Sequence, residues 1–203
     1  MRVWLPVAAI SMLAGVVSGQ DARTSGSLER PFTANGRVKM DLVAGDYQIA
    51  GSRQDRVRID WSVRDAESLA KVKARAEARG QELSITTDGP SSKGLKFTIQ
   101  VPTQSDLYVR LSAGDLTIED VRGNKDVELR AGDLRIDVGR AEDYTKVDAS
   151  LWAGDLKASA FQIFKGGLFR SMEWTGKGRY HLHAHLMAGD IYLYSKSEKA
   201  DAR

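Results

Sequence analysis

The stretch Leu111-Ser-Ala-Gly-Asp-Leu-Thr-Ile118 contains the tripeptide Ala-Gly-Asp, and the repetition of this tripeptide decides the fold. An apolar residue follows the aspartate, and a second one stands two positions later, as Leu116 and Ile118 do here. The same arrangement occurs five times, with its glycine and aspartate at Gly45 and Asp46, Gly114 and Asp115, Gly132 and Asp133, Gly154 and Asp155, and Gly189 and Asp190. A short repeat of this kind is typical of proteins built from similar stacked units.

The residues before each tripeptide alternate between apolar and polar. Leu107, Val109 and Leu111 alternate with more polar neighbours, and the other copies show the same pattern. A period of two predicts strands with one buried and one wet face. The glycine permits a bend or a close approach that a Cβ would forbid, and the aspartate can accept hydrogen bonds from backbone N–H groups of its own turn. We therefore expect each unit to be a strand, a bend and a second strand.

These features predict an all-β fold, a β-solenoid-like stack of short repeat strands with one helical insertion. A single unit cannot bury its own apolar face, so neighbouring units have to cover it. A sandwich or barrel of many short strands is the alternative. The repeated bend sequence favours the stack.

Two insertions interrupt the repeats. The segment 65–79 is rich in helix formers, with Asp65 as an N-cap and Gly80 as a stop, and it predicts the helical insertion. The segment 161–178 contains Gly166-Gly167 and several aromatic residues, and we interpret it as a loop that covers one end of the stack. Strands are expected at 57–63, 82–87 and 95–101.

The first residues are typical of a secretory signal peptide. Arg2 precedes an almost wholly apolar run from Val3 to Val17, and small residues follow it. An uncleaved membrane anchor is the alternative, but this run of about 15 residues is shorter than the roughly 20 that a spanning helix needs. We therefore divide the chain into a signal peptide (1–19), a mature N-terminal extension (20–31), a β-repeat domain (32–194) and a polar tail (195–203). The mature protein is expected to be exported, whether periplasmic, at the cell surface or secreted.

Composition excludes several classes of function. The 203 residues include no cysteine, so disulfides, thiolate metal sites and a cysteine nucleophile are absent. The net charge of +3 comes from 30 basic and 27 acidic residues spread along the chain, which argues against nucleic acid as a partner. No G-x-S-x-G, H-E-x-x-H or P-loop motif is present. We expect neither a catalytic set nor a cofactor, and no transmembrane segment in the mature chain.

The Gly-Asp repeats in an exported chain resemble the bacterial putative-adhesin β-strand-repeat family, also called toast-rack domains. The resemblance covers Phe32 to Leu193, and it includes the strand–proline–strand passage from Phe97 through Pro102 to Val109. It implies a non-catalytic extracytoplasmic domain with a role in envelope adhesion or envelope-stress sensing. The family has no established catalytic residues to carry over. The insertions at 65–79 and 161–178 depart from its plainest pattern.

The three histidines form the candidate metal site. Alternation places His181, His183 and His185 on one strand face, and His183 and His185 are weak candidates for chelating one metal ion. If the units align by their glycines, His183 stands in register with Asp126 and Asp148, which could add a ligand. A polar outward face without a ligand is the alternative. The repeated aspartates could likewise form a column neutralised by calcium, although bonding within each turn is favoured.

Three functional hypotheses follow. The first is an interaction domain that binds an envelope component or a partner protein. The second is a metal-dependent binding module that uses the histidines. The third is an enzyme that acts on polysaccharides, as some extracellular β-helices do. Outward aromatic residues could stack on sugars in such a protein, and the candidates are Trp61, Trp152, Tyr192 and Tyr194.

Overall fold

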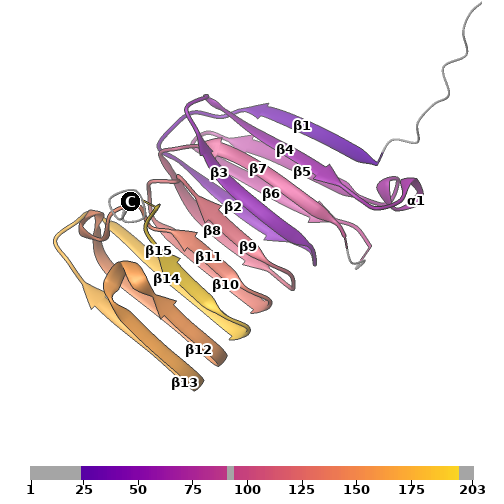
Figure 1. Ribbon diagram of the computed structural model, residues 1–203. Coiled ribbons are helices and arrows are strands. Elements are labelled where there is room, and N and C mark those ends of the chain that lie inside the picture. Colours follow the sequence, from indigo (N-terminus) through magenta and orange to yellow (C-terminus); the bar gives the residue numbers. More distant parts are fainter. Residues whose placement is uncertain (1–23, 91–93, 197–203) are drawn as a thin grey trace, which may run out of the picture.

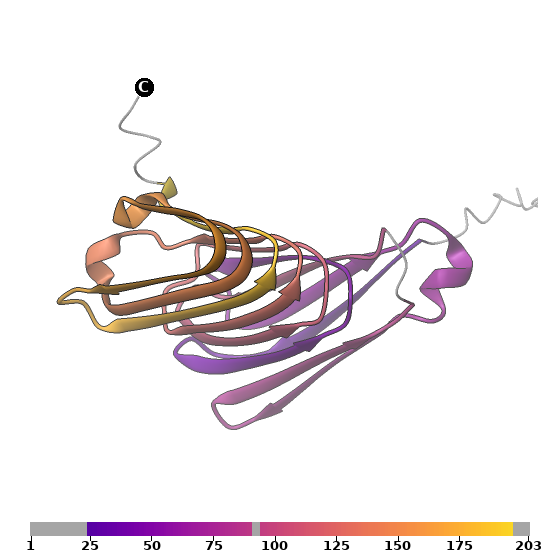
Figure 2. The same cartoon turned by 90° about the horizontal axis from the view of Figure 1, so that it is seen from below.

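The computed structural model describes residues 24–90 and 94–196, and in them the chain forms one continuous β-sheet folded into two layers (Figures 1 and 2). Layer I contains, in spatial order, β5 (Lys73–Arg79), β6 (Glu82–Asp88), β2 (Gly36–Leu42), β8 (Ser105–Leu111), β10 (Lys125–Ala131), β14 (Tyr180–Ala188) and the first half of β12 (Tyr144–Ala158). Layer II contains β1 (Ser25–Pro31), β4 (Arg56–Ser62), β7 (Lys96–Pro102), β3 (Asp46–Ser52), β9 (Leu116–Glu119), β11 (Leu134–Asp137), β15 (Ile191–Tyr194) and the second half of β12. The predicted all-β, solenoid-like class is confirmed.

Each repeat unit forms one coil of the stack. A strand of layer I runs into an Ala-Gly-Asp bend, and a strand of layer II leads away from it, as β8 and β9 do around Gly114. Strands of successive coils pair in parallel within each layer. The order of the coils differs from the order of the sequence, because β14 pairs with both β10 and β12. The last unit of the chain therefore lies inside the stack, and β12 lies nearer its end.

The glycines of the bends lie directly against one another. Four of the five have φ between 114° and 135°, a region that residues with a Cβ rarely adopt. A Cβ on Gly189 would lie 2.0 Å from the carbonyl oxygen of Gly132, and a Cβ on Gly154 would lie 1.9 Å from that of Gly189. The N–H groups of Gly132 and Gly189 donate to the alanine carbonyls of the next coil, at 3.0 Å in both cases. Only glycine lets the coils approach this closely.

The bend aspartates form a ladder that runs from coil to coil. The Oδ1 atom of Asp115 accepts a hydrogen bond from the N–H of Asp133 (3.0 Å), Asp133 accepts from Asp190 (3.2 Å), and Asp190 accepts from Asp155 (2.9 Å). Asp46 accepts a longer bond from Asp115, at 3.5 Å. The prediction of bonding within each turn was therefore wrong. Neighbouring bends lie one strand spacing apart, about 4.8 Å, and a carboxylate reaches the next N–H over that gap.

The core lies between the two layers and consists of side chains in register. The leucines that close the layer I strands stack across five coils: Leu42, Leu111, Leu129, Leu186 and Leu151. Layer II contributes a second row three positions after the bend aspartate, namely Ile49, Ile118, Ile136 and Leu193. All of these side chains are buried. Burial of each contributes roughly 1.5–3 kcal/mol to folding, and the alternation in sequence places them all on the inner face.

The helical insertion is much shorter than predicted. Helix α1 spans only Ala66–Leu69, and Asp65 caps it by accepting the N–H of Ser68 at 2.8 Å. The rest of the segment is β5, which pairs with β6 in the antiparallel direction. Alanines and charged residues alternate along β5, and Ala76 is buried. The open edge of β6 supplies backbone partners that outweigh a weak helix propensity.

The second insertion is a strand and not a loop. Strand β13 (Ile163–Thr175) pairs with β12 along both layers and covers the end of the stack. Gly166 and Gly167 lie opposite Asp155 and Gly154, so this pair carries β13 around the same bend. Two short 3₁₀ helices, η1 (Ala141–Asp143) and η2 (Ser159–Phe161), flank β12.

The proposed N-terminal extension also contains structure, because 25–31 form β1 and pair with β4. The predicted signal peptide lies outside the described residues, as does the polar tail beyond Lys196.

Replacing Gly189 by alanine tests the close contact between the bends. We expect Gly189→Ala to lower the free energy of unfolding by roughly 3 kcal/mol or more, because the strain of positive φ adds to a clash with backbone. Gly80→Ala is the matched control: Gly80 also has positive φ, but a Cβ there meets nothing within 4 Å, and strain alone costs about 1 kcal/mol. Urea unfolding midpoints measure both. Equal losses would show that the bends tolerate a Cβ.

Candidate binding cleft

The predicted histidine face lies on the outer side of β14. The register predicted for His183 is confirmed, since it pairs with Asp126 on β10 and with Asp148 on β12. Both carboxylates have cationic partners, however. Asp126 accepts a hydrogen bond from Arg110 at 3.0 Å, and Asp148 lies 3.1 Å from the ammonium group of Lys146. The register brings the three side chains to one face, but both carboxylates are already engaged in ion pairs with basic side chains.

The second candidate histidine also has a neighbour. The Nδ1 atom of His185 lies 2.9 Å from the hydroxyl of Ser150 on β12. His181 is exposed at the start of the same face, and its backbone N–H donates to the side chain of Asn124. Within 24–90 and 94–196, no three His, Cys, Asp or Glu side chains are placed to hold one metal ion. A metal-dependent site at His183 and His185 stays a hypothesis.

Of the four aromatic residues considered for sugar stacking, Trp152 is the one that stands well clear of the surface, with 53% of it exposed. Trp61 is half-buried, and its indole nitrogen has no partner among the described residues. Tyr192 and Tyr194 are half-buried, and their hydroxyl groups donate to carboxylates. Tyr192 donates to Asp190 at 2.8 Å, and Tyr194 donates to Glu119 at 3.1 Å. These four residues are not brought together into one site.

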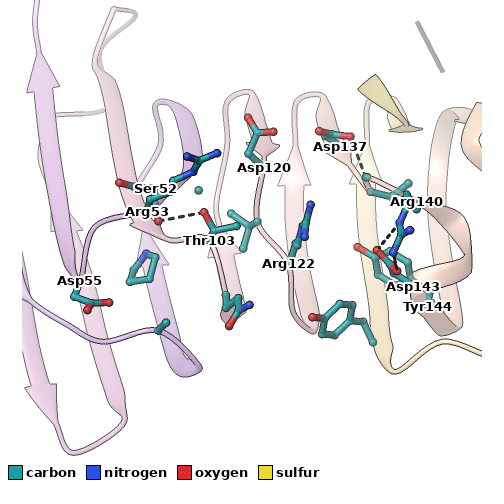
Figure 3. Close-up of a pocket in the computed structure, with 18 residues that line it drawn as sticks. Ser52, Arg53, Asp55, Thr103, Asp120, Arg122, Asp137, Arg140, Asp143 and Tyr144 are labelled. Carbon is teal, nitrogen blue, oxygen red and sulfur yellow. Dashed lines mark hydrogen bonds and ion pairs between the residues drawn. The ribbon is translucent and has the colours of Figure 1, made fainter. Parts of the chain in front are cut away.

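A cleft of about 680 Å³ lies along the edge of the stack opposite the Ala-Gly-Asp bends (Figure 3). Its walls are the loops that follow the layer II strands: the loops after β7, β9 and β11 lead back to layer I, and the loop after β3 leads to β4. Hydrogen bonds between the loops hold them in place: Thr103 donates to the carbonyl of Ser52 (2.8 Å), and Arg122 donates through its N–H to the carbonyl of Thr103 (2.6 Å). The coil spacing thereby sets the loops in a row.

Three arginines of the cleft follow this row. Figure 3 shows Arg122 in the middle, with Arg53 on one side and Arg140 on the other. Arg140 is held by Asp143, 2.7 Å from its guanidinium. Arg53 and Arg122 are exposed, and among the described residues neither guanidinium has an ion-pair partner. Two free guanidinium groups therefore offer hydrogen-bond donors to the cleft.

The rest of the lining is a mixture of acceptors and apolar surface. Asp55 is exposed, and its carboxylate has no cationic partner in the described part of the chain. The carboxylate of Asp120 forms an ion pair with the ammonium group of Lys196 at 3.3 Å. The apolar walls come from the loops and from the starts of β12 and β14, and they include Pro102, Val121, Val138, Tyr144 and Tyr180. Donors, acceptors and aromatic edges in one open cleft suit a polar ligand with many hydroxyl or carboxylate groups.

A buried lysine supports the floor of this cleft. Lys125 is 1% exposed and stands at a core-facing position, in register with Leu107 and Leu182. Its ammonium group donates to the hydroxyl of Tyr144 at 2.9 Å and to the carbonyl of Gly123 at 3.3 Å. These bonds fix the tyrosine that lines the cleft. The sequence analysis did not single out Lys125. The signal was present, because Lys125 occupies an inward-facing position of the alternation that Val127 and Leu129 continue.

Burial governs the ionisation of this pair. Desolvation lowers the pKa of Lys125 to about 8, and the nearby carboxylates of Asp137, Asp106 and Asp143 oppose the shift in part. The pKa of the Tyr144 hydroxyl is raised, first by burial and then by the carboxylates of Asp137 and Asp143. Lys125 is covered by the floor and does not itself line the cleft. The arrangement therefore supports binding by rigid polar loops, and the lysine acts through the tyrosine that it holds.

The buried lysine predicts a rise in stability with pH. In the unfolded chain its pKa returns to 10.5, so between pH 8 and 10.5 the unfolded state binds more protons than the folded one and stability increases with pH. We expect a gain of about 2 kcal/mol in the unfolding free energy between pH 7.5 and 9.5 from this group. Lys125→Met should lack that gain in urea unfolding at the two pH values. An identical pH profile in the variant would contradict the lowered pKa.

Comparisons with known proteins give a result at the level of the fold. No protein-family model and no curated protein sequence match the chain. A solved structure described as a putative cell adhesion protein from Clostridium sporogenes matches with a TM-score of 0.57 at 12% sequence identity, and the match covers 85% of this chain and 100% of that one.

Two further solved structures match more loosely. A putative adhesin from Bacteroides fragilis has a TM-score of 0.33 at 9% identity, and the match covers 85% of this chain and 98% of that protein's chain. A putative lipid binding protein from Parabacteroides distasonis has a TM-score of 0.26 at 10% identity and covers 84% and 97%. Scores this low support no conclusion. The chain shares its fold with the Clostridium sporogenes protein, and the resemblance to the adhesin β-strand-repeat family noted in its sequence is confirmed at that level.

Proposed function

We propose that the chain is an exported, non-catalytic binding domain that attaches to an envelope or extracellular partner through the cleft on the loop edge. The observation that carries this proposal is the pair of unpaired guanidinium groups, Arg53 and Arg122, set in a row of rigid loops. Adhesion and envelope-stress sensing, the two roles implied by the family resemblance, both need such a surface. No helix in the described residues is long and apolar enough to span a membrane.

The geometry of the cleft favours a linear polar polymer as partner. Coils repeat at about 4.8 Å, so an extended chain lying along the row would meet one loop after another. Guanidinium groups recognise carboxylates and hydroxyls with several donors at once, and Tyr180 presents an aromatic edge beside them. An envelope glycan has these groups. The description of the Clostridium sporogenes protein as a cell adhesion protein is consistent with attachment of this kind.

Cosedimentation with envelope fractions tests the proposal. The double variant Arg53→Gln, Arg122→Gln removes both free charges and keeps the side-chain size close, and we expect it to weaken saturable binding on the order of tenfold, as the loss of two charge-assisted contacts implies. Arg75→Gln with Arg79→Gln is the matched control, because it also removes two exposed charges but lies on β5, outside the cleft. Equal binding by all three proteins would count against the cleft.

Salt and chelator separate this proposal from the metal-dependent alternative. Binding by hydrogen-bonded guanidinium groups in the cleft should persist in part at high salt and should not respond to a chelator. Loss of binding with chelator, reproduced by His183→Ala, would favour the histidine face of β14. Turnover of wall or matrix glycans by the purified protein would favour the polysaccharide-acting enzyme instead.

A further inference from the structure

The end of the stack formed by β12, β13 and β14 has an unusual apolar surface. Within the described residues all the large hydrophobic side chains that are exposed lie on these three adjacent strands: Trp152, Phe164, Leu168, Phe169 and Met187. Their exposed fractions run from 44% at Met187 to 71% at Phe169. Single exposed hydrophobic residues are ordinary, but a group of them at one place marks an interaction surface.

These side chains are neighbours around the last bend. The rings of Trp152 and Phe169 are 5.4 Å apart between centroids. Met187 occupies on β14 the position that Trp152 occupies on β12, because each precedes the alanine of an Ala-Gly-Asp bend and the two alanines pair. Leu168 and Phe164 are exposed on β13, the strand that lies at the lower left of Figure 1. We refer to these five side chains as the apolar corner.

The same end of the molecule also carries a net positive charge. Residues 144–188 contain six basic and three acidic side chains, an excess equal to the +3 of the whole chain. The basic residues are Lys146, Lys157, Lys165, Arg170, Lys177 and Arg179, and the acidic ones are Asp148, Asp155 and Glu173. The part of the stack that exposes large hydrophobic side chains is therefore also cationic.

Two of these cations border the apolar corner without a carboxylate. The ammonium group of Lys165 donates to the carbonyl of Ser171 at 2.7 Å, and the Nε atom of Arg170 donates to the carbonyl of Gly166 at 2.5 Å. Both side chains are exposed, and neither has an ion pair in the described part of the chain. Their charge is held beside the aromatic residues and stays free to meet an anion.

The opposite end of the stack shows what an ordinary protected edge looks like. There β5 presents exposed Lys73, Arg75, Glu77 and Arg79, so that three basic side chains and one acidic side chain alternate with small alanines. Such charges discourage pairing between sheet edges. Strand β13 has the same edge position but exposes phenylalanine and leucine instead. The exposed apolar side chains of β13 therefore do not serve to protect the sheet edge, and another role has to explain them.

We propose that the apolar corner docks on the surface of a lipid bilayer that carries anionic headgroups. Aromatic and aliphatic side chains that project from a convex corner insert at the boundary between headgroups and acyl chains, and adjacent Lys and Arg side chains pair with phosphate groups. The charge argues against a second copy of the chain as occupant. An end-to-end contact would place Lys165 and Arg170 against their own equivalents, and like charges repel.

Vesicle cosedimentation tests this docking with the full chain. Vesicles of phosphatidylcholine alone are compared with vesicles that also contain phosphatidylglycerol. We expect binding to the anionic vesicles, weakened on the order of tenfold by Trp152→Ser with Phe169→Ser, because both the buried apolar area and the charge contribute. Lys165→Gln with Arg170→Gln should weaken binding to anionic vesicles at low salt only. Arg75→Gln with Arg79→Gln, which removes two charges at the far end on β5, should bind normally.

Several outcomes would overturn the proposal. Absence of binding, or equal binding by the wild-type protein and by the Trp152 and Phe169 variants, would remove the corner from any membrane contact. Self-association that depends on protein concentration and disappears in the same variants would make the corner an interface between copies. Phe164→Ser provides a second variant if the first pair unfolds, as urea midpoints would reveal. The Arg53 and Arg122 variants should bind vesicles unchanged, which separates this surface from the cleft.

Discussion

The close packing of glycine on glycine at the bends is the constraint on which the rest of the structure depends. Each coil reverses direction where a backbone carbonyl of one glycine fills the place that a Cβ of the next would need, as between Gly132 and Gly189. The carboxylate of Asp133 then accepts the N–H of Asp190 in the next coil. Two residues thus fix both the shape of the bend and the distance to its neighbour, which explains why the pair recurs in every repeat.

This fixed spacing has consequences at both edges of the stack. Along the core it brings side chains of the same kind into rows, so that apolar alternation in sequence becomes a continuous buried ladder. Along the edge opposite the bends it sets the connecting loops side by side, where their sequences are free to differ. Arg53, Arg122 and Arg140 occupy such loops. The bend supplies regularity, and the loops supply chemical variety on a rigid support.

Much of this arrangement was predictable from the sequence. Alternation and the repeated tripeptide give the strands, the bends and the stack, and alignment by glycines places His183 beside Asp126 and Asp148. The segment 73–79 was predicted wrongly because alanine, lysine and glutamate favour helices in isolation. The free edge of β6 is a tertiary feature that local composition does not reveal.

Other features depend on contacts between distant residues. The coil built from β14 and β15 lies between two earlier coils, and similar repeat sequences do not specify which neighbour each one selects. The ladder of aspartates has the same cause, since its partners are 18 to 69 residues apart. The burial of Lys125 was missed, but it does not depend on such distant contacts. Lys125 alternates with Val127 and Leu129, and this pattern alone places it on the inner face. A charged residue in an apolar alternation is a signal for buried polar structure.

The two surfaces argued for binding lie on opposite edges of the stack. The apolar corner belongs to the bend edge at its cationic end, and the cleft belongs to the loop edge, separated by the length of a strand. A strand of seven residues such as β10 spans roughly 20 Å. If the corner rests on a bilayer, the row of arginines faces away from it. A partner held in the cleft would then be kept at a fixed distance from the membrane, which is the geometry that a domain for attachment requires.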